Sequence, residues 1–218
     1  NVPYIGTLIA PITVLVFFFE MNVPRNISML KTFKVFLVGG GASLFFTLLL
    51  FEIAPSADTS NISGAIVVGI VEEIGKVGIC AYFISKHKGK LYLLNGIVYG
   101  GAVGAGFAVF EWLMQTGNTG ELYEAFYVAM LDTVKVRGFL SPGGHIAWAA
   151  VEGFAIILAL KGAEFGWEAL AKATFLKIVW IPVALHALWD APLFIQTQFM
   201  SNCKMIFLVV SIWIVLLI

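Results

Sequence analysis

The chain has 218 residues, of which 60% are hydrophobic and 12% are charged, and its mean hydropathy is +0.95. A soluble domain carries roughly twice that charged fraction, so this composition excludes a soluble globular protein and indicates an integral membrane protein. The 13 basic and 13 acidic residues balance, which gives no reason to expect a nucleic-acid partner, and two cysteines, Cys80 and Cys203, do not make a disulfide framework.

Apolar runs long enough to cross a bilayer recur along the chain. A membrane-spanning helix needs about 20 apolar residues, and about seven such runs are separated by charged or turn-forming residues. They cover residues 4–19, 33–51, 63–85, 91–113, 143–160, 167–189 and 204–218. Segment 121–140 carries too much charge for a lipid-exposed span and predicts an interfacial or re-entrant helix. The expected fold is all-α, a polytopic transmembrane helix bundle that forms a single membrane-embedded domain over residues 1–218.

Basic residues concentrate in two of the predicted loops, which sets an expected orientation. The connection between the second and third spans holds Glu52 and Asp58 and no basic residue. We expect the two basic loops in the cytoplasm of a multi-pass protein of the cell membrane. The N-terminal end of the sequence would then be non-cytoplasmic and the C-terminal end cytoplasmic. The basic loops contain Arg25, Lys31 and Lys34, and Lys86, Lys88 and Lys90.

Several predicted spans contain ionisable residues, each of which costs at least about 2.5 kcal/mol in a membrane and so suggests a function. Because consecutive spans run in opposite directions, one residue from each of four spans, Glu72, Glu111, His145 and His186, falls in the outer half of the membrane. One shared site is the simplest explanation of this agreement in depth. The residues are Glu72, Glu73 and Lys76 in the third span, Glu111 in the fourth, His145 in the fifth, and His186 and Asp190 near the end of the sixth.

Each of these residues, taken alone, also has a structural interpretation. Glu72, Glu73 and Lys76 could form an ion cluster that fixes helix packing. Glu111 could reach the outer interface, and an isolated histidine such as His145 is commonly a hydrogen-bonded packing residue. Their joint presence in separate spans favours a site.

A stripe of glycines predicts which face of the fourth span points into the bundle. Gly96, Gly100 and Gly104 form two consecutive G-x-x-x-G units, which let one helix approach another closely. Glu111 follows Gly104 by two helical turns and so lies near the same stripe. Glu152 lies on the same face of its span as His145 and is a candidate supporting residue.

The residue types suit a metal centre. Two neutral imidazoles and carboxylate oxygens from separate helices are a set that binds zinc with an open position for water, and a further carboxylate can act as general base. Hydrolysis of a peptide bond in the membrane fits this chemistry. The H-E-x-x-H motif of zincins, the G-x-G-D of aspartyl intramembrane proteases and the G-x-S-G of rhomboids are absent from the sequence.

The order of these motifs resembles the PrsW intramembrane proteases, relatives of the CAAX prenyl endopeptidases and bacteriocin-processing enzymes. The resemblance covers about residues 63–195, the expected catalytic core. The CAAX branch has E-E-x-x-x-R and F-x-x-x-H at the first two motifs, and the different residues here favour the PrsW type. The four motifs are Glu72-Glu73-x-x-Lys76, Phe107-x-x-x-Glu111, the isolated His145, and His186-x-x-x-Asp190.

The resemblance implies a metal-dependent endopeptidase that cuts a single-span, membrane-anchored regulator, such as an anti-sigma factor, on its extracytoplasmic side. Our hypothesis is that Glu72 activates the attacking water with support from Glu73, although either carboxylate of the pair could face the site. A divalent metal, zinc, would be held by Glu111, His145 and His186. Asp190 would orient His186 or stabilise the oxyanion, and Lys76 would neutralise the glutamate pair, with Phe107 and Glu152 supporting the site.

Three other functions remain open from the sequence. A CAAX-type prenyl-protein endopeptidase uses similar motifs. An ion- or proton-coupled transporter also places carboxylates and histidines in membrane spans, although these residues form no path across the bilayer. A haem protein could use His145 and His186 as axial ligands, but this function would leave the glutamates without a role.

Overall fold

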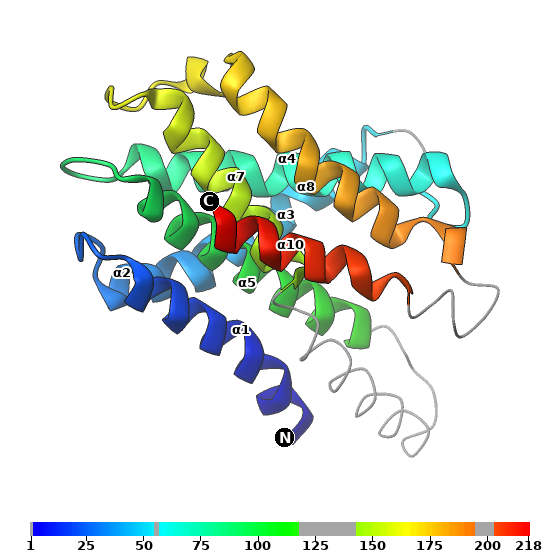
Figure 1. Cartoon of the computed structure of the whole chain (residues 1–218). Coiled ribbons are helices and arrows are strands. Elements are labelled where there is room, and N and C mark those ends of the chain that lie inside the picture. Colours follow the sequence, from blue (N-terminus) through cyan, green and yellow to red (C-terminus); the bar gives the residue numbers. More distant parts are fainter. Residues whose placement is uncertain (1, 55–56, 118–142, 195–202) are drawn as a thin grey trace.

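The computed structural model describes residues 2–54, 57–117, 143–194 and 203–218, and every regular element in these ranges is helical (Figure 1). This confirms the all-α prediction for the described part of the chain. Two short 3-10 segments, Trp167–Ala171 and Pro192–Phe194, flank α8. The main helices are α1 (Val2–Met21), α2 (Met29–Lys34), α3 (Gly40–Phe51), α4 (Ile62–Ser85), α5 (Leu93–Gly117), α7 (His145–Leu160), α8 (Ala173–Asp190) and α10 (Met205–Leu217).

The observed helices follow the predicted spans, with three differences, of which the simplest is that α5 ends at Gly117, four residues after the predicted end. A π-helical segment, Val35–Gly39, joins α2 and α3 into one continuous rod that begins at Met29, four residues before the predicted span. In the sixth span, α8 begins at Ala173 and not at residue 167, because the apolar residues before it form a separate 3-10 turn. The predicted interfacial helix at 121–140 lies outside the described residues.

Three helices among the described residues are long and apolar enough to cross a membrane: Met29–Phe51, Leu93–Met114 and Ala173–Asp190. Shorter apolar helices occupy Leu8–Met21, His145–Leu160 and Met205–Leu217. Helix α4 has 24 residues but carries three charged side chains near its middle. The helices fit a membrane protein, and the count of seven spans stays a prediction.

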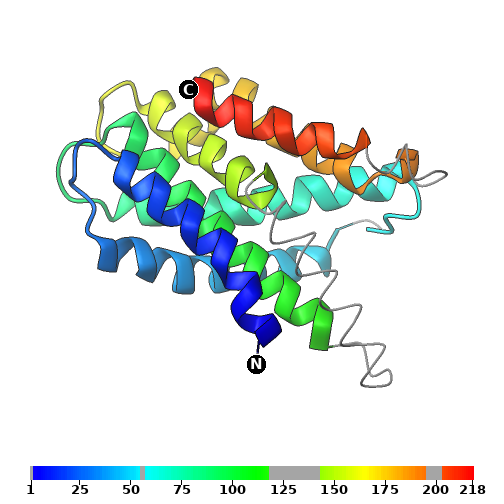
Figure 2. The same cartoon turned by 60° about the horizontal axis from the view of Figure 1, so that its bottom comes forward.

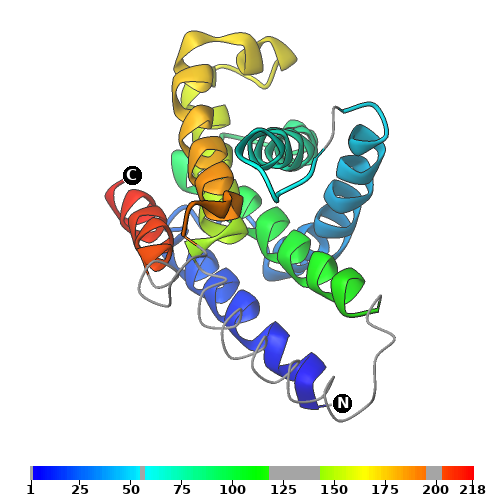
Figure 3. The ribbon, with the colours of Figure 1, turned by 90° about the vertical axis from the view of Figure 1, so that its right-hand side faces the viewer.

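Helix α4, which contains Glu72 and Glu73, lies between other helices of the bundle. Its N-terminus is capped by Asn61, whose Oδ1 accepts a hydrogen bond from Gly64 N–H at 2.8 Å. Figure 3 shows α4 end-on between α3 and α8. On the α8 side, a Cβ atom on Gly69 would lie 3.1 Å from the carbonyl oxygen of Val183, so this glycine allows the two helices to approach closely. The approach brings the end of α8 within reach of the α4 carboxylates.

The glycine stripe of α5 packs directly on α7, as the sequence predicts. A Cβ atom on Gly100 would lie 1.8 Å from Ala149 O, and one on Gly104 would lie 2.1 Å from His145 O. These backbone approaches leave no room for larger residues. The first turn of α7 is therefore held against the part of α5 that precedes Glu111.

The two basic loops lie at the same end of the bundle, on the left of Figure 1. Asparagine side chains join them. Asn95 Nδ2 donates to Asn22 Oδ1 at 2.9 Å and to Asn26 Oδ1 at 2.7 Å, and Asn26 Nδ2 donates to Asn95 Oδ1 at 3.0 Å. The site described below is built from the middle of α4, the second half of α5, the start of α7 and the end of α8, and it lies away from these loops.

Helix α10 closes the other flank and lies against α7 and α8 (Figure 2). It faces the neighbouring helices with the buried residues Leu208 and Ser211. Most of its other side chains are exposed and apolar, which suits contact with lipid.

Candidate functional site

The two adjacent glutamates of α4 differ in how deeply they are buried. Glu73 and Lys76 are completely buried, and Lys76 Nζ donates to Glu73 Oε1 at 2.6 Å. Glu72 points toward α8, and its side chain is 12% exposed. The sequence hypothesis had Lys76 neutralise the glutamate pair, and in the structure its ion-pair partner is Glu73. Of the pair, Glu72 is the one that meets solvent or substrate.

His186 of α8 lies between these carboxylates. Its Nδ1 atom is 2.5 Å from Glu73 Oε1, and because a carboxylate only accepts, Nδ1–H is the donor. Nε2 then faces Asp190 Oδ2 at 3.3 Å and Glu72 Oε2 at 3.6 Å. A carboxylate that holds one imidazole nitrogen and leaves the other facing the site is the usual arrangement around a metal-binding histidine. In the structure Glu73 makes this bond, whereas Asp190 approaches the opposite nitrogen.

His145 is the first residue of α7 and reaches the site from the opposite side. Lys76 Nζ lies 2.9 Å from its Nδ1 atom, and because an ammonium group has donors only, Nδ1 accepts. Its Nε2 atom lies 3.1 Å from Glu111 Oε2, so Glu111 of α5 also belongs to the site. The centroids of the two imidazole rings are 5.0 Å apart.

Aromatic rings form the inner wall. Phe107 packs on the His145 ring with centroids 5.1 Å apart, and Lys76 Nζ lies 5.1 Å from the centre of the same phenyl ring. Trp148 stacks on His186. Trp148 was missed by the sequence reasoning, and the signal that could have found it is its position one helical turn after His145. These rings exclude water from the side of the site that holds Lys76.

Glu152 is completely buried, one helical turn deeper on α7 than Trp148. It interacts electrostatically with Glu73 and Lys76. Neither of its carboxylate oxygens has a hydrogen-bond donor within reach in the described part of the chain. Glu152 thus lies behind the site, next to the Glu73–Lys76 pair, and has no described contact with His145.

The outer side of the site is partly open. The side chains of His145, Glu111 and Asp190 are 16%, 15% and 23% exposed, while that of His186 is 3% exposed. The accessible atoms are thus those of Glu72, Glu111, Asp190 and one edge of His145. A substrate and its water would meet these groups, and the Glu73–Lys76 pair would support them from behind.

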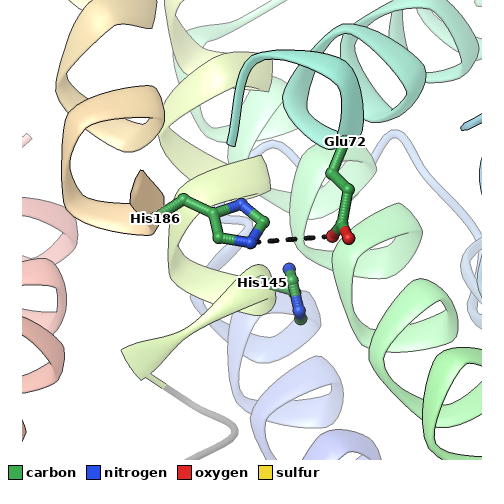
Figure 4. A group of neighbouring side chains, drawn as sticks. All are labelled: Glu72, His145 and His186. Carbon is green, nitrogen blue, oxygen red and sulfur yellow. Dashed lines mark ion pairs between the residues drawn. The ribbon is translucent and has the colours of Figure 1, made fainter. Parts of the chain in front are cut away.

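Three of these residues converge closely enough to hold a metal ion. Ligand atoms of Glu72, His145 and His186 lie within 4.8 Å of one another (Figure 4). In a tetrahedral zinc site, bonds of about 2.0–2.1 Å put neighbouring ligand atoms about 3.3 Å apart, so small side-chain movements would complete the set. Glu72 Oε2 is buried and has no hydrogen-bond donor among the described residues, as expected of an atom that awaits a cation. The donor set fits a divalent metal.

A helical membrane protein whose buried histidines and carboxylates can hold a divalent metal has the groups that a metal-dependent hydrolase needs. Comparison with family models makes the class specific: the model of the PrsW family intramembrane metalloproteases matches residues 28–218. The chain belongs to this family. The match includes the second and seventh predicted spans, which the motif resemblance alone did not cover. No curated protein and no solved structure matches the chain.

Proposed function

We propose that this metalloprotease hydrolyses a peptide bond in a single-span membrane protein, a regulator of the anti-sigma-factor kind, on the extracytoplasmic side of the membrane. The observation that carries the proposal is the convergence of Glu72, His145 and His186 from three separate helices. The active unit is a single membrane-embedded domain with its catalytic core at residues 63–195.

We propose Glu72, His145 and His186 as the metal ligands and zinc as the metal, since imidazole and carboxylate donors in a tetrahedral arrangement suit zinc. To bind the cation, His145 would have to release one of its present contacts, the Lys76 ammonium at Nδ1 or the Glu111 carboxylate at Nε2. When bound, a divalent cation lowers the pKa of a water molecule and polarises the scissile carbonyl. This assignment exchanges two roles relative to the sequence hypothesis, in which Glu111 was a ligand and Glu72 the base. The exchange rests on Glu72 Oε2, the buried oxygen that lacks a donor.

Glu111 is then the general base. It is partly exposed, and its Oε2 atom is 3.1 Å from a nitrogen of the ligand His145, so it borders the position that the attacking water would occupy. Glu111 takes the proton from the attacking water and returns it to the amine that leaves. Glu73 orients His186 by accepting its Nδ1–H, and Lys76 neutralises Glu73. Asp190 lies 3.3 Å from Nε2, the nitrogen left for the cation, and so borders the metal position.

The orientation of the site supports cleavage on the extracytoplasmic side. The basic loops, expected in the cytoplasm, lie at one end of the bundle, and the accessible side chains Glu111 and Asp190 lie near the helix ends away from those loops. A substrate within the bilayer would approach from this end. The transporter and haem interpretations lose their basis because the chain belongs to a metalloprotease family.

The test uses the purified protein and a co-expressed library of single-span substrates. We expect Glu72→Gln, His145→Ala and His186→Ala to lose metal and cleavage together. Glu111→Gln should keep its metal and lose about 10²–10⁴-fold in rate, the usual contribution of a general base. Glu164→Gln, a change of an exposed carboxylate outside the site, is the matched control. If all four site variants cut as the unchanged protein does, the proposed site is wrong.

A further inference from the structure

Trp148 packs against both imidazoles, which are themselves in contact, so the three rings form a cluster. Its indole stacks on His186 with ring centroids 4.6 Å apart and an interplanar angle of 23°. It meets His145 edge-on, at a centroid distance of 5.3 Å and an angle of 87°. The side chain is almost completely buried. Any rotation of the indole would therefore displace one imidazole or the other.

The indole is held from outside the catalytic core. Trp148 Nε1–H donates to Ser211 Oγ of α10 at 2.9 Å, and the bond is buried. The Ser211 hydroxyl in turn donates to Phe207 O at 2.8 Å, which aims a lone pair of Oγ at the indole. Ser211 is the one hydroxyl-bearing residue among the 13 residues of α10. A buried indole N–H needs an acceptor, and this serine is placed to provide it.

A second polar contact ties α10 to the same site. Lys204 Nζ, just before α10, donates to Trp189 O at 2.7 Å, next to Asp190 at the end of α8. The helix is thus attached by hydrogen bonds to both helices that carry the histidines. Apolar packing against lipid alone would not require either bond.

We propose that Ser211 and Trp148 are positioning residues: Ser211 fixes the indole plane, and the indole fixes the separation and tilt of His145 and His186 for metal binding. This inference rests on the proposed metal site. It extends the functional unit to α10, which lies beyond the predicted core of residues 63–195. Neither residue touches the reacting atoms.

The experiment compares Ser211→Ala with a rescue variant, Ser211→Thr, which keeps the hydroxyl. Ser43→Ala is the matched control, because Ser43 is also completely buried and its hydroxyl also bonds a carbonyl of its own helix, Gly40 O at 2.8 Å. The metal dissociation constant of the purified protein is measured by competition with a chromophoric chelator. The indole N–H signals of the six tryptophans are observed by nitrogen-15 NMR of the metal-free protein, and Trp148→Phe identifies the relevant signal.

We expect Ser211→Ala to shift the Trp148 N–H signal and to weaken metal binding by about 10-fold, the lower end of the effect of removing a supporting hydrogen bond around a metal site. Ser211→Thr should restore both values, and Ser43→Ala should change neither. The inference is overturned if Ser211→Ala binds metal as the unchanged protein does, or if Ser43→Ala weakens binding equally. His186→Ala separates the two proposals: if it keeps full metal affinity, the metal site itself is wrong and this inference falls with it. If His186→Ala loses the metal and Ser211→Ala does not, only the positioning role fails.

Discussion

The buried ion pair between Lys76 and Glu73 is the feature whose removal should cost the most stability. The two charged atoms are 2.6 Å apart and both side chains are fully buried. Glu73→Gln keeps the shape and removes the one charge that directly contacts both the Lys76 ammonium and the His186 ring among the described residues. Removing one partner of a buried pair typically costs about 3–5 kcal/mol, because the remaining charge stays buried and uncompensated. At 1.4 kcal/mol per factor of ten, the folding equilibrium should fall by about two to three and a half orders of magnitude.

The bundle offers a matched comparison at the surface. Arg25 Nη2 and Glu20 Oε2 are 2.8 Å apart, nearly the same separation, but both side chains are more than half exposed. Glu20→Gln should therefore cost at most about 1 kcal/mol. The free energy of unfolding is measured by titration with a denaturing detergent in mixed micelles.

The double variant Glu73→Gln with Lys76→Met tests the physical reason for the loss. Replacing both partners of a buried pair by neutral groups of similar volume is often close to neutral for stability. We expect the double variant to be more stable than Glu73→Gln, so the two single costs should not add. The reasoning is refuted if Glu73→Gln costs no more than Glu20→Gln, or if the costs of the two single changes add in the double variant.

Three further outcomes are expected. Gly100→Ala should destabilise the protein by about 3 kcal/mol, because its Cβ would lie 1.8 Å from Ala149 O. The control Gly41→Ala, whose Cβ would lie 3.6 Å from its nearest neighbour, should change stability by no more than about 1 kcal/mol. Thermal unfolding of the two variants compares these costs. Removal of metal with a chelator should abolish cleavage, and added zinc should restore it; cleavage that persists in metal-free protein would contradict the proposed chemistry. Burial, and secondarily the Lys31 ammonium, lowers the pKa of His87 from its ordinary value of 6.5. As the pH falls, the unfolded chain therefore binds a proton at this histidine before the folded chain does, and the free energy of unfolding should decline below about pH 6.5. His87→Asn should flatten this part of the stability profile, measured by unfolding at a series of pH values.

The helices and the residues that form the site could be predicted because each has a recognisable pattern in the sequence. Charge inside an apolar run is costly, so Glu72, Glu111 and His186 stand out, and structure brings them together as expected. The glycine stripe of α5 predicts a close helix contact, and the structure places α7 there. Hydropathy alone did not separate the 3-10 turn at Trp167–Ala171 from α8, because both are largely apolar.

The pairing within the site could not be predicted, for geometric reasons. Adjacent residues on a helix point about 100° apart, so spacing alone does not decide whether Lys76 pairs with Glu72 or Glu73. That choice depends on how the other helices pack around α4, since α8 brings His186 Nδ1 to Glu73. Trp148 and Ser211 went unnoticed because an uncharged residue in an apolar helix has no cost that marks it as unusual. Their importance is visible only through the hydrogen bond between α7 and α10.

The charge balance of the site gives an independent physical argument for a metal. Five carboxylates, those of Glu72, Glu73, Glu111, Glu152 and Asp190, gather around two imidazoles and the Lys76 ammonium, with the Lys204 ammonium interacting with Asp190 at the edge. With the carboxylates ionised and the imidazoles neutral, negative charge is in large excess, and a medium of low dielectric makes that excess costly. A divalent cation between Glu72, His145 and His186 would offset most of it. The metal should therefore stabilise the fold as well as supply the chemistry, and chelation should lower the unfolding temperature of the unchanged protein but not that of His186→Ala.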